Sequence, residues 1–304
     1  MKENNQNYLR LGDLCKQGGR NMQQSGSKDH LPEAELLLAD LLNISREYLL
    51  SHPEQKIEEN IKKKYEKLIT ERKKGVPIAY LTGYKEFYGL RFAVNKNVLI
   101  PRPETELLVD EVLKRLARKK GTKKVMIADI GAGSGCIPVS LLKNGKEKID
   151  KIFCSDTSRQ ALKTAYFNAV AHGVEGCIKF LHGNFALPLF YELKDIKKSS
   201  EFIVTANLPY LSEEKYKNSP SIQKEPPLAL LGGGSDGLEA YKILLHQLHR
   251  LDTKIRSKIL IFCELDDDQV ELFKEIVVDL FTFYKLTFKK DLKGNYRLAI
   301  LELK

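Results

Sequence analysis

The amino-terminal part of the chain has two different hydrophobic patterns. Apolar side chains recur at helical spacing through residues 31–75, and the lysines and glutamates between them fit solvated helix faces. Residues 78–100 instead carry aromatic and β-branched side chains punctuated by glycines, which predicts a hairpin or a short extended connector. The pattern therefore predicts a small helical bundle within residues 1–83, followed by a β-hairpin linker over residues 84–100.

The remainder, residues 101–304, alternates between helical and strand-like segments and is predicted to form one larger domain. Predicted strands cover 124–130, 151–155, 178–181, 201–205 and 258–264, with predicted helices at 104–119, 136–144, 159–172 and 238–251. Such alternation is typical of a parallel sheet with helices on both faces. Two final strand-like runs, 283–289 and 296–303, are joined by a turn at Lys293-Gly294-Asn295, which predicts an antiparallel hairpin at the end of the sheet.

Composition narrows the class of protein. The chain has 304 residues and a formal net charge of +10, but its lysines are interleaved with glutamates, so the charge alone does not indicate nucleic-acid binding. No apolar run approaches the roughly 18 residues that span a bilayer. Residues 1–20 lack the features of a secretory or transit peptide. Its five cysteines are scattered without a Cys-x-x-Cys pair, which argues against a disulfide framework or a zinc site. We expect a soluble, cytoplasmic protein without a membrane segment or a metal site.

A glycine-rich turn follows the first predicted strand. Gly131-Ala132-Gly133-Ser134-Gly135 stands between an apolar strand and a helix. Glycines at this place allow a tight turn and let the backbone approach a ligand beside the amino terminus of the helix. The motif lacks the Gly-Lys-Ser/Thr of a P-loop, and its third glycine falls one place early for a dinucleotide fingerprint. It predicts a ligand site of a different class.

Two further candidates stand at the ends of the next two strands. Asp156 lies where ligands of open α/β sheets bind, and its carboxylate can accept hydrogen bonds from both hydroxyls of a ribose. The alternative is that Asp156 caps the following helix. Phe185, in the pair Asn184-Phe185, is a candidate for contact with an adenine ring, and core packing is its alternative role. Together with the glycine turn, Asp156 favours a nucleoside site.

The segment Asn207-Leu208-Pro209-Tyr210 follows the predicted strand 201–205. The Asn207 side-chain oxygen and the Leu208 carbonyl can each accept one hydrogen of a substrate NH2 group. Pro209 fixes the backbone, and Tyr210 supplies a flat, amphipathic face. The segment therefore predicts a site for a planar amide or amino group, whereas a plain loop is the alternative when it is considered alone.

In this order, the glycine turn, Asp156 and Asn207-Leu208-Pro209-Tyr210 resemble S-adenosylmethionine-dependent methyltransferases that modify amide or exocyclic amino nitrogens. The resemblance narrows to the release factor glutamine methyltransferases, the HemK/PrmC family, through the run from Leu99 to Leu108 and several downstream positions. These positions are Glu225, Pro226, Leu228, Ala229, Leu230, Gly233, Asp236, Gly237, Leu238, Tyr241, Glu264, Gln269 and the run 291–294. The resemblance covers about residues 31–304.

The resemblance implies a Rossmann-like α/β methyltransferase domain over residues 101–304, preceded by a helical domain that recognises the substrate. It implies methyl transfer from S-adenosylmethionine to the side-chain amide nitrogen of the glutamine in the Gly-Gly-Gln motif of peptide chain release factors, a modification in translation termination. Cofactor contacts are expected from Gly131, Ala132, Gly133, Ser134, Gly135, Asp156, Phe185 and Asn207. Catalysis and substrate binding are expected from Asn207, Leu208, Pro209 and Tyr210.

Other motif positions have less defined expected roles. Arg102, Glu104 and Thr105 would line a cleft or begin a helix, and Glu225 and Asp236 would order a loop over the substrate. The six histidines are dispersed, and no Ser/His/Asp or Cys/His set stands out in the sequence.

One departure from the family pattern leaves alternatives open. The family usually has proline where this chain has Leu208, and Asn-Leu-Pro-Tyr is the form familiar in ribosomal RNA adenine dimethyltransferases. A nucleic-acid amino-methyltransferase is therefore the second hypothesis, and a non-catalytic protein that keeps the fold is the third. Such a dimethyltransferase would have its glycine turn near the amino terminus, whereas here the turn follows a helical domain. Nucleic acid is accordingly not the expected substrate.

Overall fold

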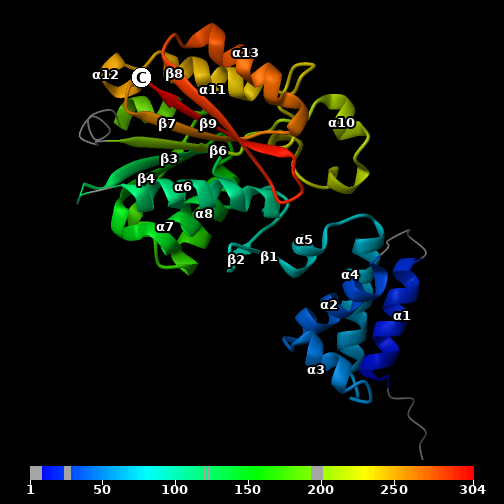
Figure 1. Cartoon of the computed structure of the whole chain (residues 1–304). Helices are drawn as coiled ribbons and strands as arrows, with labels where there is room; N and C mark the ends of the chain where they lie inside the picture. The colour runs from blue at the N-terminus through cyan, green and yellow to red at the C-terminus, as the bar shows by residue number, and fades with distance from the viewer. Residues whose placement is uncertain (1–8, 24–28, 120, 122, 193–200) are drawn as a thin grey trace, which may run out of the picture. The chain divides into compact units, whose positions relative to one another are not determined.

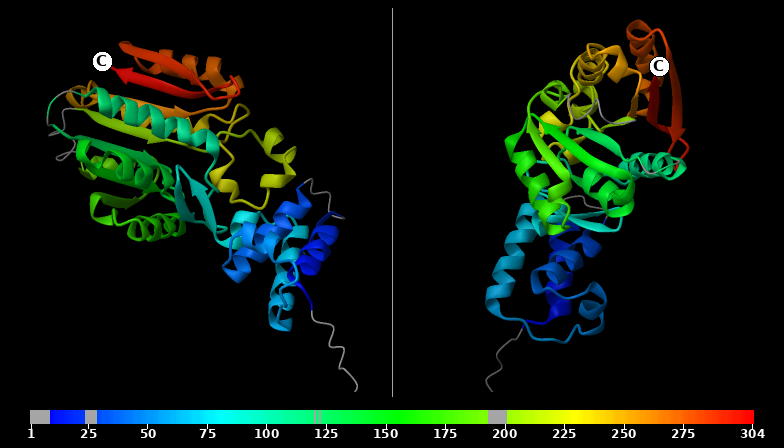
Figure 2. Two further views of the ribbon diagram at one scale, coloured as in Figure 1. Left: turned by 60° about the horizontal axis from the view of Figure 1, so that its bottom comes forward. Right: turned by 90° about the vertical axis from the view of Figure 1, so that its left-hand side faces the viewer.

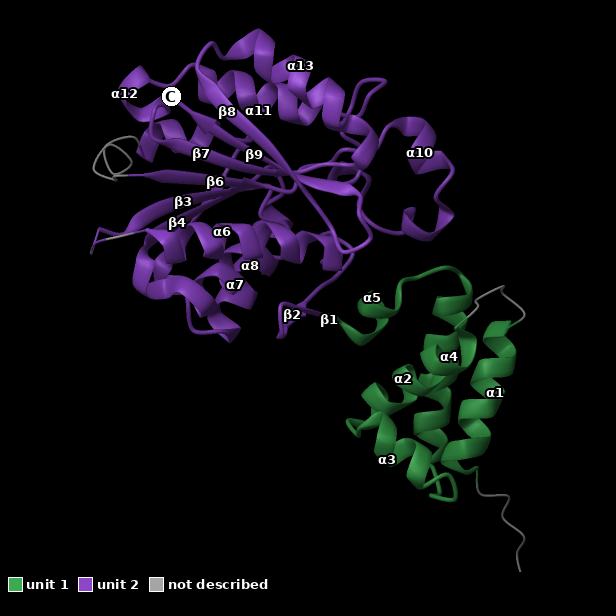
Figure 3. Cartoon of the chain, in the orientation of Figure 1, with its two compact units in different colours: residues 1–84 green, residues 85–304 purple. Residues whose placement is uncertain are grey.

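The computed structural model describes residues 9–23, 29–119, 121, 123–192 and 201–304. The chain divides into two compact units, Met1–Tyr84 and Lys85–Lys304, coloured separately in Figure 3. Each unit has buried apolar clusters of its own, one in the first unit and two in the second.

The first unit is built from α-helices. They are α1 (Leu11–Gln23), α2 (His30–Leu42), α3 (Arg46–Ser51), α4 (Glu59–Lys73) and α5 (Ile78–Thr82). Tyr65 lies in the core of the unit, where its hydroxyl donates to the Ala34 carbonyl at 3.0 Å. The helical prediction for residues 31–75 is confirmed.

Two helices of the first unit differ from the sequence-based prediction. The pattern does not predict α1, because its adjacent glycines, Gly18 and Gly19, are poor helix formers. Gly18 is required where it stands, since a Cβ there would lie 2.2 Å from the Tyr65 hydroxyl oxygen. The connector predicted over residues 78–100 begins instead with the single-turn helix α5, which Gly83 ends in the left-handed conformation.

A two-stranded sheet of β1 (Tyr84–Phe87) and β2 (Leu90–Ala93) begins at the boundary between the units, at Tyr84. The second unit continues with a seven-stranded sheet of order β5-β4-β3-β6-β7-β9-β8. The parallel strands of the larger sheet are β3 (Val125–Ile130), β4 (Ile149–Asp156), β5 (Ile178–His182), β6 (Phe202–Ala206) and β7 (Ile259–Glu264). The last two strands, β8 (Tyr284–Lys290) and β9 (Tyr296–Leu303), form an antiparallel hairpin, and β9 pairs with β7. The predicted α/β sheet with a terminal antiparallel hairpin is confirmed.

Helices cover both faces of the larger sheet (Figure 1). On one face lie α6 (Glu106–Arg118), α7 (Cys136–Gly145) and α8 (Arg159–Ala171), and on the other lie α11 (Glu239–His249), α12 (Thr253–Arg256) and α13 (Val270–Leu280). The short α10 (Glu213–Lys217) stands apart from the sheet. The pattern does not predict α13, because the β-branched run Ile276-Val277-Val278 masks its helical spacing. Figure 2 shows the same layers from two further directions.

Short 3-10 helices connect several of these elements. They are η1 (Pro103–Thr105), η2 (Lys146–Lys148), η3 (Glu175–Cys177), η4 (Leu187–Glu192), η5 (Pro220–Ile222), η6 (Pro227–Ala229) and η7 (Asp267–Gln269). None of the described helices is both long and apolar enough to cross a lipid bilayer.

The strand order determines where a ligand can bind. The chain enters the sheet at β3, adds β4 and β5 on one side, and then returns to place β6 and β7 on the other side. Crossovers leave β3 in opposite directions, so a crevice forms at the carboxyl ends of β3, β4 and β6. Every residue of β3 is buried, which makes this strand a rigid centre for the crevice.

Candidate functional site

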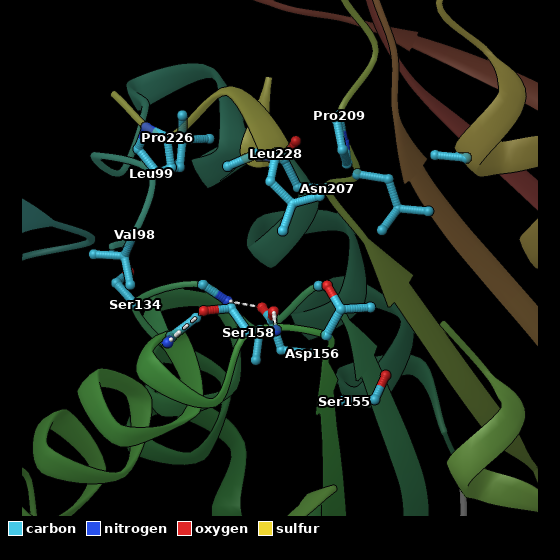
Figure 4. A pocket seen from close by; sticks show the side chains of 18 of the residues that line it. Val98, Leu99, Ser134, Ser155, Asp156, Ser158, Asn207, Pro209, Pro226 and Leu228 are labelled. Carbon is cyan, nitrogen blue, oxygen red and sulfur yellow. Dashed lines mark hydrogen bonds between the residues drawn. The ribbon is translucent and has the colours of Figure 1, made fainter. Parts of the chain in front are cut away.

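A cavity of about 450 Å³ lies at the carboxyl ends of the parallel strands, entirely within the second unit. In the close-up of Figure 4, Asp156, Ser158 and Ser134 lie on one side of the cavity, and Asn207, Pro209 and Leu228 lie on the other. Most of the candidate residues line it: Gly131, Ala132, Gly133, Ser134, Asp156, Phe185, Asn207, Leu208 and Pro209. Gly135 and Tyr210 are not among the lining residues.

The glycine turn is shaped by backbone hydrogen bonds. The N–H groups of Gly131 and Ala132 both donate to the Ser155 carbonyl, at 2.9 and 3.0 Å. All three glycines have positive φ, which side-chain-bearing residues rarely adopt. Gly135 has a second reason to be glycine, because a Cβ there would lie 3.0 Å from the Ala165 Cβ. Gly135 therefore brings the start of α7 against α8 and is not part of the cavity wall.

Asp156 faces the glycine turn from the end of β4. Its Oδ2 accepts from the Gly133 N–H at 3.0 Å, and its Oδ1 accepts from the Ser158 N–H at 2.8 Å. Burial raises the pKa of this carboxyl, and the backbone N–H donors offset only part of that effect. The Ser158 side chain caps α8 by accepting from the Ala161 N–H. The alternative role for Asp156, as the cap of that helix, is therefore wrong.

Phe185 contributes an unusual backbone conformation to the cavity wall. Its φ is +46°, and the Ser155 hydroxyl donates to its carbonyl at 2.7 Å. The next N–H group, that of Ala186, donates to Gln247 Oε1 at 2.8 Å. Phe185 lines the cavity and also packs against the adjoining core cluster, so both roles considered for it are geometrically compatible.

Two donors of the Asn207-Leu208-Pro209 segment are bonded to other residues of the protein. Asn207 Nδ2 donates to Thr105 Oγ1 at 2.9 Å, and the Leu208 N–H donates to the Tyr241 hydroxyl at 3.1 Å. Pro209 has no N–H group. These groups are therefore not available to a ligand, whereas the side-chain and backbone oxygens of the segment can accept hydrogen bonds.

The structure gives a physical reason for leucine at position 208. The Leu208 side chain is only 2% exposed, and its Cδ2 lies 3.0 Å from where a Cβ on Gly131 would stand. Leu208 thus packs across β3 and β6 and joins the glycine turn to the Asn207 segment.

Tyr210 belongs to a second, smaller cavity. This cavity of about 130 Å³ shares Leu99, Arg102, Asn207, Leu208, Pro209 and Ala229 with the first, and Tyr210 and Glu264 line it as well. The Tyr210 carbonyl accepts from Gln269 Nε2 at 2.7 Å, and its hydroxyl donates to Glu264 Oε1 at 3.3 Å. Burial raises the pKa of Tyr210.

Glu264 is a buried acid at the end of β7. It is 2% exposed, and burial raises the pKa of its carboxyl to about 7, while the Thr105 hydroxyl, Arg297 and the Tyr210 hydroxyl offset part of the effect. The Tyr241 hydroxyl donates to the Glu264 backbone carbonyl. Tyr241, Glu264 and Gln269 match the family motif in sequence, but only the structure shows that they hold the Asn207–Tyr210 segment.

The remaining motif positions fix neighbouring loops. Glu225 is buried, accepts from the Ile100 N–H at 3.0 Å and pairs with the Arg102 guanidinium. Asp236 accepts from the Leu238 N–H and from Lys242 Nζ at the start of α11. Glu104 pairs with Lys293 and does not line either cavity.

The described residues hold no group of three or more His, Cys, Asp or Glu side chains that is arranged to bind a metal ion.

Comparisons with known proteins agree with the two-unit architecture. A PrmC N-terminal domain model matches residues 13–83, and a methyltransferase small domain model matches residues 103–211. The release factor glutamine methyltransferase of Bacillus cereus is 30% identical over 296 residues, which are 97% of this chain and 100% of that protein. The release factor glutamine methyltransferase of Coxiella burnetii is 38% identical over 224 residues, which are 73% of this chain and 74% of that protein.

A solved structure supports the fold independently. The hMettl16 catalytic domain in complex with MAT2A 3'UTR hairpin 1 matches with a TM-score of 0.54 at 14% identity, over 81% of each chain. At that identity the likeness shows a shared α/β methyltransferase fold and nothing about the acceptor.

Proposed function

The chain belongs to the release factor glutamine methyltransferase family, and on that premise we propose that it transfers a methyl group from S-adenosylmethionine to a glutamine of a release factor. The acceptor is the side-chain amide nitrogen of the glutamine in the Gly-Gly-Gln motif of a peptide chain release factor, a cytoplasmic protein substrate. The observation that carries this proposal is that the Asn207 side-chain donor and the Leu208 N–H are already bonded within the protein, which leaves oxygens of the segment to accept from a substrate NH2 group.

The groups that line the larger cavity fit S-adenosylmethionine. The two Asp156 oxygens each hold one backbone N–H and keep a further lone pair for the ribose hydroxyls. A Cβ on Gly133 would meet no atom closer than 3.8 Å, so the turn leaves room for a ligand against its backbone. Gly131 to Ser134, Asp156, Phe185 and Asn207 would hold the cofactor, with Gly135 supporting the turn from behind.

The acceptor side of the cavity suits an NH2 group. An amide nitrogen is a weak nucleophile because its lone pair is delocalised into the carbonyl. The Asn207 side-chain oxygen and the Leu208 carbonyl would each accept one of its hydrogens, which favours the charge that develops on nitrogen. Tyr210 and Pro209 would pack against the glutamine side chain and exclude water.

When bound, S-adenosylmethionine would supply a methyl group on a positively charged sulfur, with a neutral thioether as the leaving group. The substrate nitrogen would form the new bond to the methyl carbon and would lose one proton to solvent as the product leaves the site. The main contribution of Asn207 and Leu208 is orientation, since a well-oriented reacting pair gains about 7–11 kcal/mol in favourable model systems.

Transfer of labelled methyl to purified release factor tests the proposal. Wild-type factor, a factor with Gln→Ala in its Gly-Gly-Gln loop, and ribosomal RNA are run in parallel. Label on the wild-type factor that is lost with the glutamine is the expected result. Label on RNA alone would instead identify a nucleic-acid amino-methyltransferase, which is the second hypothesis that Leu208 leaves open.

We also propose that residues 1–83 bind the body of the release factor. This unit has its own core, and neither of the two cavities described above is lined by its residues. A chain that begins at Lys85 should keep its affinity for S-adenosylmethionine and lose transfer to intact release factor. Equal turnover by the full and shortened chains would contradict this role, and circular dichroism of the shortened chain checks that it is folded.

A further inference from the structure

We infer that Thr105 is a positioning residue that holds the Asn207 amide with its oxygen toward the acceptor. The inference rests on the proposed function, since this orientation matters for a substrate that presents N–H groups. Asn207 Nδ2 donates to Thr105 Oγ1 at 2.9 Å, and Thr105 is 2% exposed. An amide carries its NH2 and its oxygen on opposite arms of one plane, so fixing the nitrogen also fixes the oxygen.

A hydroxyl can donate as well as accept, and a second neighbour sets the direction of this hydrogen bond. That neighbour is Glu264, whose Oε2 is buried without a partner of full hydrogen-bond geometry among the described residues. The Thr105 hydroxyl lowers the pKa of this carboxyl, as a hydroxyl does when its hydrogen faces a carboxylate. An amide NH2 group only donates, so the Thr105 oxygen accepts from Asn207. When the Glu264 carboxyl is ionised it only accepts, and it then favours the arrangement in which the Thr105 hydrogen faces Glu264.

The Thr105 hydroxyl also stands on a rigid support. Thr105 ends η1 directly before α6, and the Thr105 N–H donates to the Arg102 carbonyl at 3.1 Å. The buried face of α6, formed by Leu108, Val109 and Val112, packs in the core under the sheet. Asn207 follows β6, whereas Thr105 stands at the start of α6, a helix that precedes β3 in the chain. The orientation of the Asn207 side chain is thereby set by a distant part of the sequence.

Two substitutions at this position separate positioning from packing. Thr105→Val keeps the size and the methyl group of the side chain but removes the hydroxyl, whereas Thr105→Ser keeps the hydroxyl and removes the methyl group. We expect Thr105→Val to lower kcat for methyl transfer about tenfold, which is the rate effect of losing one hydrogen bond that orients a catalytic group. Its affinity for S-adenosylmethionine should stay at the wild-type value, and Thr105→Ser should restore most of kcat.

A second readout does not depend on activity. In 15N-labelled protein, the Asn207 side-chain NH2 signal is identified by its absence in Asn207→Asp. We expect its hydrogen exchange to be slow in the wild type and in Thr105→Ser, and fast in Thr105→Val, because only the hydroxyl holds the NH2 group.

The outcomes distinguish the inference from the proposed function. If the wild type does not methylate release factor but the exchange pattern holds, the function is wrong and the orientation of Asn207 stands. If the wild type is active and Thr105→Val matches it in kcat and in exchange, the inference is overturned. Loss of activity in Thr105→Ser together with full activity in Thr105→Val would also overturn it, because that result assigns Thr105 a packing role.

Discussion

The two walls of the larger cavity are built by different means. The glycine-turn wall, Gly131–Ser134 with Asp156, is held largely by hydrogen bonds of backbone groups. These bonds join Gly133 to Asp156 across 23 residues and the Ser134 carbonyl to the Asn168 side chain across 34. The acceptor wall, Asn207–Tyr210, is held by side chains from other elements. Its contact from Asn207 to Thr105 spans 102 residues, and that from Tyr210 to Gln269 spans 59.

We expect this difference between the two walls to separate the residues that bind the cofactor from those that orient the substrate. A wall made by the backbone depends on positive φ and close approach rather than on particular side-chain groups, which suits a cofactor held through its invariant parts. A wall made by distant side chains fixes the direction of each polar atom, as orientation of a reacting nitrogen requires. Substitutions on the acceptor wall should therefore change kcat, and those on the glycine-turn wall should change cofactor affinity.

The largest effect is expected at Asn207. Asn207→Ala removes the acceptor that favours charge on the substrate nitrogen, and we expect kcat to fall about a hundred- to a thousandfold. Affinity for S-adenosylmethionine, measured by calorimetry, should fall far less than kcat, because Asn207 is one of several proposed cofactor contacts. Asn218→Ala, an exposed asparagine at the end of α10, is the matched control and should match the wild type. If Asn207→Ala loses cofactor affinity in proportion to its activity, the proposed division between a cofactor-binding wall and a substrate-orienting wall is wrong.

Asp156 should show the opposite behaviour. Asp156→Ala removes the acceptor for two hydroxyls, and charge-assisted hydrogen bonds of this kind predict a loss in S-adenosylmethionine affinity of about a hundredfold. At saturating cofactor, kcat should stay near the wild-type value. Asp150, an exposed acid on the same strand, provides the control Asp150→Ala. A fall in kcat with unchanged affinity would place Asp156 in the chemistry and contradict its assignment to the cofactor wall.

The same contrast explains which features the sequence could predict. The alternation of strands and helices that begins at β3, the antiparallel end of the sheet and the position of the glycine turn depend on local pattern, and the structure confirms them. The sequence leaves Asp156 with two possible roles, as a helix cap or as a ligand contact, because an acid two residues before Ser158 fits both. The hydrogen bond from the Ala161 N–H to the Ser158 hydroxyl shows that Ser158 is the cap.

The supports of the acceptor wall could not be predicted from local pattern. Thr105 fits a helix start by its residue type, and Tyr241 and Glu264 lie in a helix and at the end of a strand. Their hydroxyl and carboxyl groups meet the segment Asn207–Tyr210 only after the sheet has formed. Leu208 likewise acquires a reason only when β3 and β6 lie side by side and its side chain reaches Gly131.

The smallest effect concerns Gly135, which supports the glycine-turn wall from behind. Gly135 and Gly173 both have positive φ, +78° and +68°, so alanine at either position incurs strain of about 1 kcal/mol. A Cβ at Gly173 meets nothing within 4 Å, whereas one at Gly135 lies 3.0 Å from the Ala165 Cβ. Gly135→Ala should therefore lower the free energy of unfolding by about 1 kcal/mol more than Gly173→Ala does, because α7 and α8 must separate. Urea unfolding of both full-length variants measures this difference. Equal losses would mean that close approach of these helices does not shape the turn, and that positive φ alone explains its glycines.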